Sequence, residues 1–231
     1  MSELITYQLN DGVATLALCN GKVNALSPAL IEAIGECLDR AEQDKAVVVL
    51  TGQPGLFSGG YDLKVMTSGP QQATNLVAAG SALTRRMLAH PYPIVIACSG
   101  HAIAKGAFLL LAADYRLGAD GPFQIGLNEV LIGMTMHHAG IALARDRLSP
   151  SGLQRAVNNA EMFSPAQALQ VGFLDQLSSP DSLLADAQAV AQQLAKLNMR
   201  AHAATKRKVR APLLEALERA IALDREHLLS A

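Results

Sequence analysis

The 231-residue chain has no tryptophan, only three cysteines and no long hydrophobic run. Its longest apolar stretches, such as residues 107–113, fall far short of the roughly 20 residues that a membrane-spanning helix needs. The cysteines are widely spaced and form no CxxC pair, so we expect three small buried side chains without a disulfide framework or a thiol zinc site. The charges nearly cancel, with 19 basic against 20 acidic residues, and this balance argues against a nucleic-acid-binding surface.

The composition that remains is typical of a compact folded chain. Half of the residues are apolar and 17% are charged, whereas disordered chains combine low hydrophobicity with high net charge. The N-terminus carries Glu3 and then enters an alternating run, without the basic start and apolar core of a signal peptide. We therefore expect a cytoplasmic protein.

Strand and helix patterns alternate at first and then give way to helices. Two alternating runs at 5–9 and 13–18 flank an Asn-Asp-Gly turn and predict a hairpin. Continuous apolar runs at 47–51 and 93–98 predict strands buried on both faces. Helical spacing follows Pro28 and Pro70. Further segments are expected as a short apolar helix at 106–113, short strands at 115–117 and 123–125, helices at 138–146, 151–159 and 166–171, a last strand at 172–177, and helices at 185–197 and 213–229.

Several catalytic motifs are incomplete. Residues 55–60 have the glycine spacing of a P-loop, but Tyr61 stands where its lysine is needed. No GxGxxG joins a strand to a helix, and residues 98–100 lack the leading glycine of a nucleophile elbow. His137 and His138 are adjacent and no HExxH occurs, so we expect no metal centre.

Two glycine-containing loops follow predicted buried strands. Residues 57–63 read F-S-G-G-Y-D-L, and residues 99–106 read S-G-H-A-I-A-K-G just before an apolar helix. Glycines let a backbone approach a ligand closely, and a helix N-terminus presents free N–H groups to negative charge. The loops are compatible with plain tight turns and with an oxyanion hole.

The chain resembles the crotonase (enoyl-CoA hydratase/isomerase) superfamily over most of its length. Five segments carry the resemblance, in the family's order and spacing. They are 21–27 (G-K-V-N-A-L-S), 48–63 (ending F-S-G-G-Y-D-L), 100–114, 126–133 (G-L-N-E-V-L-I-G) and 164–174 (S-P-A-Q-A-L-Q-V-G-F-L). The resemblance implies an α/β crotonase-like superhelix of ββα turns, with a core at 1–181 and a C-terminal helical region at 182–231 that forms homotrimers or dimers of trimers.

The resemblance also implies a site for an acyl-CoA or enoyl-CoA thioester. The backbone N–H groups of Tyr61 and Lys105 take the places of the family's oxyanion-hole donors, which bind the thioester oxygen and stabilise an enolate. Lys105 replaces a usual glycine, so its backbone needs a conformation that a non-glycine residue can hold. Coenzyme A would enter as part of the substrate, with no tightly bound cofactor. Its expected contacts are Lys22, Val23, Ala25, Asp62, Leu63 and Lys64.

The family's two hydratase carboxylates map to Glu129 and to Phe108, which holds no proton. Because one base can shuttle a proton between two carbons of an enoyl thioester, the resemblance favours double-bond isomerisation with Glu129 as acid and base. Glu129 would then need a pKa near neutrality, which an apolar wall including Phe108 would provide. His137 and His138 are candidates for a second proton relay, although structural hydrogen bonding is the favoured role.

Two alternatives stay open. One is hydration, and the other is a non-catalytic acyl-CoA-binding or RNA-binding relative, suggested by Phe108, Lys105 and a basic cluster at 206–210. The cluster comprises Lys206, Arg207, Lys208 and Arg210. We expect this cluster to be an exposed helix face, and we expect structural hydrogen bonds from the motif residues Asp62 and Asp114.

Overall fold

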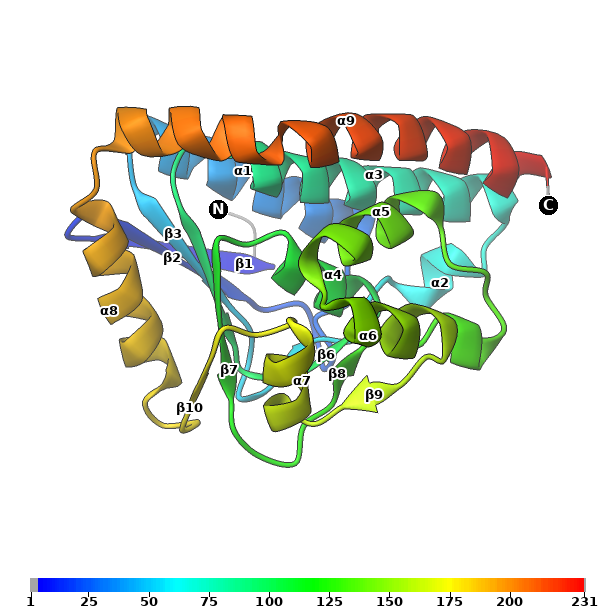
Figure 1. The fold of residues 1–231 in the computed structure, drawn as a ribbon, viewed down its shortest axis with the longest axis horizontal. Coiled ribbons are helices and arrows are strands. Elements are labelled where there is room, and N and C mark those ends of the chain that lie inside the picture. The colour runs from blue at the N-terminus through cyan, green and yellow to red at the C-terminus, as the bar shows by residue number, and fades with distance from the viewer. Residues whose placement is uncertain (1–3, 231) are drawn as a thin grey trace.

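The structure, a computed structural model, describes residues 4–230 as two β-sheets enclosed by helices. Figure 1 shows the long helix α9 across one side of the molecule, with α1 and α3 beneath it and α8 beside the larger sheet. The helices are α1 (Pro28–Gln43), α2 (Leu63–Met66), α3 (Pro70–Ala89), α4 (Lys105–Leu111), α5 (His138–Arg147), α6 (Pro150–Leu153), α7 (Pro165–Val171), α8 (Leu183–Ala195) and α9 (Met199–Ser230), with a 3-10 turn η1 (Val130–Ile132) and a π segment η2 (Gln154–Asn158).

The larger sheet has six strands and the smaller sheet has four. The larger has the order β1 (Ile5–Asn10), β2 (Val13–Leu18), β3 (Val47–Thr51), β5 (Ile94–Cys98), β7 (Tyr115–Ala119) and β10 (Gln176–Ser178). The smaller has the order β4 (Gly55–Ser58), β6 (Gly100–Ile103), β8 (Ile125–Gly126) and β9 (Met162–Phe163). The β1–β2 and β8–β9 pairs are antiparallel, and the other pairs are parallel.

The chain visits both sheets in turn, which produces a repeated ββα unit. After β3 in the larger sheet come β4 in the smaller sheet and then α2 and α3; β5, β6 and α4 repeat the sequence. This arrangement confirms the expected α/β fold of ββα turns. Because β4 and β6 pair in parallel, the loops that leave them emerge at the same edge of the small sheet.

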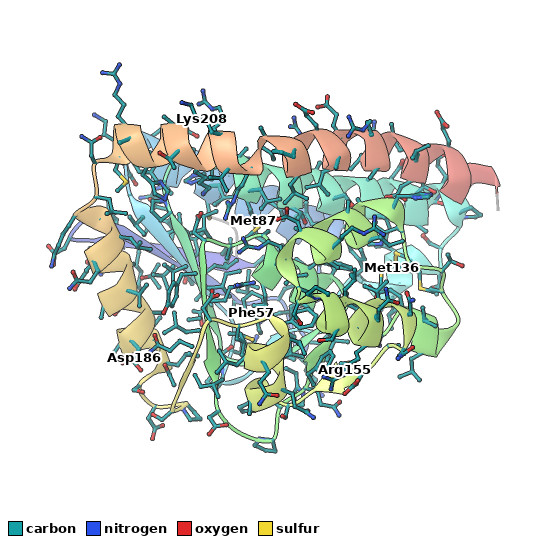
Figure 2. All side chains as sticks on the ribbon, in the orientation of Figure 1. Phe57, Met87, Met136, Arg155, Asp186 and Lys208 are labelled. Atoms are coloured by element: carbon teal, nitrogen blue, oxygen red, sulfur yellow. The ribbon has the colours of Figure 1, made fainter. Side chains whose placement is uncertain are left out.

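Apolar cover on both faces of the larger sheet explains its uninterrupted hydrophobic strands. Along β3, Val48 and Leu50 belong to the main core, while Val47 and Val49 pack in a second cluster with α8 residues such as Ala187. A strand that is covered on both faces needs an apolar side chain at every position. The sequence therefore predicted β3 and β5 correctly. Phe57, at the end of the small-sheet strand β4, is likewise in the interior (Figure 2).

Local capping fixes the helix ends that the sequence predicted. The Ser27 hydroxyl accepts a hydrogen bond from the Leu30 amide at 3.2 Å, directly before Pro28 at the start of α1. Ser164 forms a capping box with Gln167 at the start of α7. These caps confirm both predicted helix starts.

Several elements differ from the prediction. Strands β4 and β6 lie in segments that the sequence analysis took for loops, and β9 was not predicted. Helix α9 continues through Pro212, where the sequence suggested a new helix from residue 213. A proline costs a helix one hydrogen bond, but α9 is bonded to α3 on both sides of that position, by Arg210 to the Leu88 carbonyl and by Arg85 to Glu218. The last strand begins at residue 176 instead of 172, because Gly172 ends α7 with a φ of +102°. No helix within residues 4–230, α9 included, has both the length and the apolar composition needed to cross a membrane.

The prediction that all three cysteines are buried is wrong for two of them. Cys98, in the central strand β5, is buried, but Cys19 is exposed and Cys37 is half-buried. Cys19 follows the last residue of β2, where the chain leaves the sheet, so its position in an apolar run did not place it in the core.

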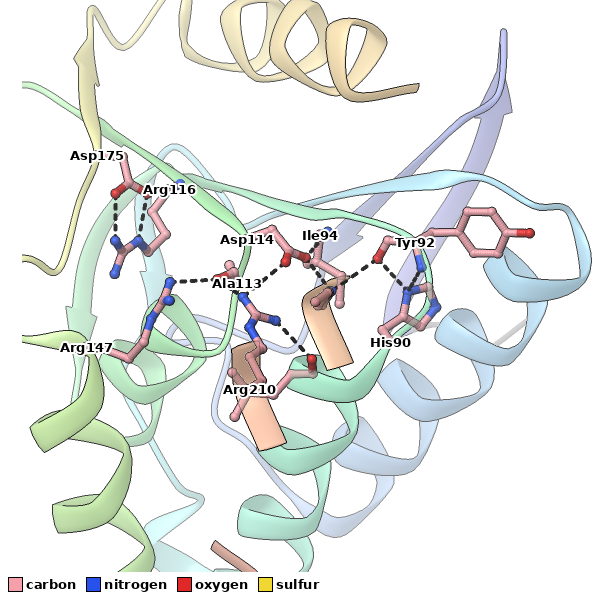
Figure 3. A network of polar contacts seen from close by, with 11 residues as sticks. His90, Tyr92, Ile94, Ala113, Asp114, Arg116, Arg147, Asp175 and Arg210 are labelled. Carbon is pink, nitrogen blue, oxygen red and sulfur yellow. Dashed lines mark hydrogen bonds and ion pairs between the residues drawn. The ribbon is translucent and has the colours of Figure 1, made fainter. Parts of the chain in front are cut away.

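The basic cluster is divided between two sides of α9, which corrects the expectation of an exposed face. Lys206 and Arg210 are each 8% exposed and pair with Asp114, at 2.6 Å from Nζ and 3.0 Å from Nη2. Figure 3 shows the pair between Arg210 and Asp114. Asp114 also accepts the Ile94 amide at 2.8 Å, which confirms its structural role. Arg207 and Lys208 remain exposed, with Lys208 on the outer side of α9 in Figure 2. Two of the four cations that suggested the RNA-binding alternative are therefore buried.

Candidate active site

The loops that follow β4 and β6 touch each other at the edge of the small sheet. A Cβ added to Gly60 would lie 3.1 Å from the Ala104 Cβ and 3.5 Å from the Lys105 amide nitrogen. The contact brings the backbones of Tyr61 and Lys105 into one site. Lys105 is the first residue of α4, and the first amides of a helix have no partner within it. Among residues 4–230, neither of these two amides donates to a backbone carbonyl.

Both loops place a left-handed backbone conformation directly before the amide. Gly60 has a φ of +99° and Ala104 has a φ of +50° with a ψ of −120°. Lys105 itself begins a regular helix, which is a conformation that a non-glycine residue can hold, as the sequence analysis required. The positive φ falls on Ala104. The loops are fixed by hydrogen bonds from the Leu26 amide to the Gly60 carbonyl (2.8 Å) and from the Ala104 amide to the Gly126 carbonyl (2.9 Å).

Glu129 lies between β8 and η1 and is 8% exposed. Burial raises the pKa of its carboxyl group to about 7, although its own backbone N–H and the charge of Lys105 oppose the shift. Within the described residues, its Oε2 atom has no hydrogen-bond partner. A carboxyl group with these properties can take up and release a proton near neutral pH.

The side chain of Lys105 is buried close to this site, a feature that the sequence analysis missed. It is 2% exposed, its Nζ donates to the Thr84 Oγ1, and Nζ lies 5.9 Å from the centroid of the Tyr61 ring. Burial lowers the pKa of this amine to about 7, against the opposing effect of the Glu129 charge. The signal in the sequence was a lysine at the head of an otherwise apolar segment, K-G-A-F-L-L-L.

Phe108 and His137 form an apolar wall behind the site. The rings meet edge to face with centroids 5.3 Å apart, and Phe108 is 1% exposed. Burial holds the pKa of His137 well below its usual value. His137 therefore stays neutral at neutral pH, which argues against the proton relay that was weighed beside the favoured structural role.

Asp224 of α9 is a second residue that the sequence did not single out. It is 3% exposed, and its carboxylate accepts the His138 amide at 2.6 Å and the Ala139 amide at 3.0 Å. A carboxylate on the first amides of a helix is stabilised by their unpaired N–H groups. Asp224 thus connects α9 to the start of α5 by hydrogen bonds, next to His137.

The six residues expected to contact coenzyme A gather on the surface beside the first loop. The Gly59 amide donates to the Val23 carbonyl at 2.8 Å, which joins residues 22–25 to the loop. Lys22, Val23, Leu63 and Lys64 are exposed and Ala25 is half-buried. The Asp62 carboxylate accepts the Lys64 amide at 2.9 Å and caps α2, the structural role expected of it.

An open cavity of about 530 Å³ lies beyond Glu129. Its lining is mostly apolar and comes from η1, the segment after it, α5 and η2, including Val130, Met134, Met136, Ile141 and Val157. The neighbouring side chain of Leu131 is 69% exposed. The site therefore combines two free amides, one titrating carboxyl group and apolar surroundings.

Comparison with known proteins identifies the family. The profile of the enoyl-CoA hydratase/isomerase family matches residues 8–231. The mitochondrial enoyl-CoA delta isomerase 1 of Mus musculus is 33% identical over 184 residues, which cover 78% of this chain and 64% of the mouse protein. The chain thus spans just under two thirds of the length of that relative.

Solved structures agree with this assignment. An enoyl-CoA hydratase/isomerase family protein from Pseudomonas syringae superposes with a TM-score of 0.96 at 63% identity, covering 97% of this chain and 98% of the other. The human mitochondrial delta3-delta2-enoyl-CoA isomerase superposes with a TM-score of 0.93 at 28% identity, covering 98% and 91%. The crotonase fold expected from the sequence is confirmed, and the chain belongs to the enoyl-CoA hydratase/isomerase family of the crotonase superfamily.

Proposed function

We propose that this protein isomerises 3-enoyl-CoA thioesters to 2-enoyl-CoA thioesters through an enolate, with Glu129 as its single acid/base. The observation that carries the proposal is a buried carboxyl group with a pKa of about 7 beside two contacting loops, while Phe108 fills the position of a second carboxylate. Relatives that are named enoyl-CoA isomerases support this reaction.

In the proposed reaction, the amides of Tyr61 and Lys105 donate to the thioester oxygen. The Glu129 carboxylate removes a proton from C2, and the electron pair of that C–H bond delocalises over C2, C3 and C4 and onto the oxygen. The protonated Glu129 then gives the proton to C4, which leaves the double bond between C2 and C3. Each preorganised amide contributes on the order of 3 kcal/mol of transition-state stabilisation.

We propose that coenzyme A lies along the exposed edge formed by residues 22–25 and 62–64. Exposed lysines at Lys22 and Lys64 flank this edge and would attract the negatively charged phosphates. The backbone of Val23, Ala25, Asp62 and Leu63 would border the bound molecule. Substituting both lysines by glutamine should raise KM and leave kcat nearly unchanged, because their contacts are remote from the reacting carbons.

The test of the reaction is to mix the protein with 3-enoyl-CoA thioesters of several chain lengths and follow the conjugated-thioester absorbance. Absorbance should rise, and Glu129→Gln should lower kcat by roughly 10²–10⁴-fold. Glu36→Gln, an exposed carboxyl group on α1, is the matched control and should leave kcat unchanged. Undiminished turnover in Glu129→Gln would contradict the proposed role of Glu129 as the acid/base.

Hydration is the second candidate, supported by the hydratase/isomerase assignment of the family. The same assay with 2-enoyl-CoA thioesters distinguishes it, because addition of water destroys the conjugated absorbance. A fall that is lost in Glu129→Gln would replace isomerisation by hydration.

We also propose a homotrimer, or a dimer of trimers, built with the C-terminal region 182–231, in the cytoplasm. The support is the family resemblance, together with apolar residues that are exposed on the long helix α9. Val209, for example, is 74% exposed. Analytical ultracentrifugation of the full chain should give the mass of three or six copies. A monomer at micromolar concentration would contradict it.

A further inference from the structure

An open cavity of about 470 Å³ lies where α9 begins, and the reaction described above gives it no role. Its lining comes from the link between α8 and α9, the first turns of α9, the last residue of α5 and the segment before β7. None of the residues that line it belongs to the candidate active site. Its volume is within the range of about 300–1,000 Å³ that is usual for small-molecule sites.

Positive charge is in excess at this cavity. Among the described residues that line it, three are cations, Arg147, Lys206 and Arg210, and one is a carboxylate, Asp114. Asp114 is already shared between the Lys206 Nζ at 2.6 Å and the Arg210 Nη2 at 3.0 Å. Asp146 is exposed and acts on Arg147 from outside the lining. One carboxylate therefore serves three cations.

Arg147 is the cation that has no carboxylate partner. Its Nη2 donates to the Ala113 carbonyl at 2.9 Å (Figure 3), but within residues 4–230 its buried Nε has no hydrogen-bond partner and its guanidinium forms no ion pair. The nearby Asp175 is paired with Arg116 at 2.6 Å. Burial and the charges of Arg116 and Arg210 lower the pKa of Arg147 to about 10. A largely buried guanidinium of this kind is stabilised by any anion that reaches it.

His202 of α9 lines the same cavity and is also incompletely bonded. Its Nδ1 is buried and has no hydrogen-bond partner within the described residues. Buried polar atoms are normally hydrogen-bonded, so two such nitrogens beside one cavity, on Arg147 and His202, indicate a missing partner that carries acceptor atoms. The lining also includes the exposed apolar side chains of Leu197 and Ala201.

We propose that this cavity binds an amphiphilic oxyanion, which is a carboxylate or phosphate group on a short apolar chain. The anionic group would accept hydrogen bonds from the guanidinium of Arg147, whose planar array of donors suits both kinds of oxyanion, and from a hydrogen on Nδ1 of His202. The apolar chain would lie against Leu197 and Ala201. The anion would thus supply the charge that Asp114 cannot give to a third cation.

The test is calorimetric titration of the full chain with hexanoate, hexyl phosphate and hexanol. At least one of the two anions should bind, and hexanol, which has the same chain without the charge, should bind roughly tenfold more weakly, because hydrogen bonds to charged groups are the stronger ones. Tighter binding of hexanoate identifies a carboxylate ligand, and tighter binding of hexyl phosphate identifies a phosphate ligand. Binding of neither anion, or equal binding of hexanol, would overturn the proposal.

Variants on α5 place the bound anion. Arg147→Met should weaken the binding of the anion by roughly tenfold or more. The matched control is Arg145→Met, which removes an exposed cation two residues earlier in the same helix turn and should leave the affinity unchanged. If Arg147→Met does not fold, Ala201→Phe fills the cavity from an exposed position and should abolish binding.

The NMR signal of the His202 ring gives a second readout of the same place. Its Cε1 proton is assigned by its loss in His202→Gln, and its chemical shift should move as the anion is added. An unmoved His202 signal, together with equal binding by Arg147→Met and the wild type, would put the anion elsewhere and overturn the proposal. No enoyl-CoA is turned over in these measurements, so their outcome is independent of the proposed function.

Discussion

The ring of Phe108 meets the ring of His137 edge to face, with the centroids 5.3 Å apart and the planes at 77°. Phe108 thereby fills, with apolar atoms, the position where the family resemblance places a second carboxylate. Its burial also removes water from His137, whose pKa is held well below its usual value by desolvation. The contact thus joins the apolar residue at that position to a histidine that burial keeps neutral.

Phe108→Ala should lower the free energy of unfolding by about 3–5 kcal/mol, the usual cost of deleting a fully buried aromatic ring. Water admitted to the cavity should also raise the pKa of His137 toward its ordinary 6.5. Urea denaturation measures the first effect and the ¹H NMR titration of His137 the second. Phe108→Leu, which keeps most of the volume, is the control; an unmoved His137 titration in Phe108→Ala would contradict the role of the ring.

The buried Glu129 should cost the protein stability above neutral pH. Its pKa is raised from 4.5 to about 7, so between these values the unfolded chain is ionised while the native carboxyl keeps its proton. Stability attributable to this group therefore falls as the pH rises through that interval. Glu129→Gln should match the wild type near pH 4 and exceed its unfolding free energy by about 3 kcal/mol near pH 8, at about 1.4 kcal/mol per pKa unit.

Urea unfolding at the two pH values checks this prediction, and Glu36→Gln is the control because that carboxyl group is exposed. A stability difference of the same size at both pH values would mean that the glutamine acts through packing and not through ionisation.

The contact between Gly60 and Ala104 should couple the two loops energetically. A Cβ at position 60 would approach the Ala104 Cβ and the Ile103 carbonyl oxygen to 3.1 Å each, at a φ of +99°. Gly60→Ala should therefore cost about 1–3 kcal/mol and lower kcat by displacing the Tyr61 amide. Ala104→Gly removes one of the two close contacts and relieves a φ of +50°, so the double variant should be more stable than the sum of the two single variants predicts.

A thermodynamic cycle from urea unfolding of the four proteins measures the coupling, which should be about 0.5–3 kcal/mol for residues in contact. Strict additivity would show that the loops do not touch in solution. Gly12→Ala, at another positive φ but with no atom within 4 Å of the added Cβ, separates backbone strain from the contact.

The sequence predicted the scaffold because local signals and burial agreed there. The β-branched runs of β3 and β5 and the Ser27 and Ser164 caps follow from residues close together in the chain. The order of ββα units came from the family resemblance, because the local patterns did not predict β4 and β6. The positions of the site loops followed from the same order, since parallel strands end at one edge.

The errors arose where a distant segment decides a residue's environment. Lys206 and Arg210 belong to a polar helix, and they are buried against partners about ninety or more residues earlier, among them Asp114 and the Leu88 carbonyl. The Lys105 side chain is enclosed by Thr84 of α3 and by Tyr61, and Asp224 meets α5 from the far end of the chain. Such contacts depend on how α9 and α3 pack, which no periodicity in the sequence encodes.

The Asp114 cluster in Figure 3 gives the last prediction, because one carboxylate there holds two cations. Asp114→Asn leaves Lys206 and Arg210 buried without a counter-charge and should lower the unfolding free energy by about 3–5 kcal/mol. Lys206→Met keeps the pair between Arg210 and Asp114 and should cost much less. Urea unfolding at neutral pH compares the two variants. Because neither substituted residue belongs to the candidate active site, kcat per folded molecule should be unchanged in both. Equal destabilisation by the two variants would show that the charge balance at Asp114 is not what stabilises this region.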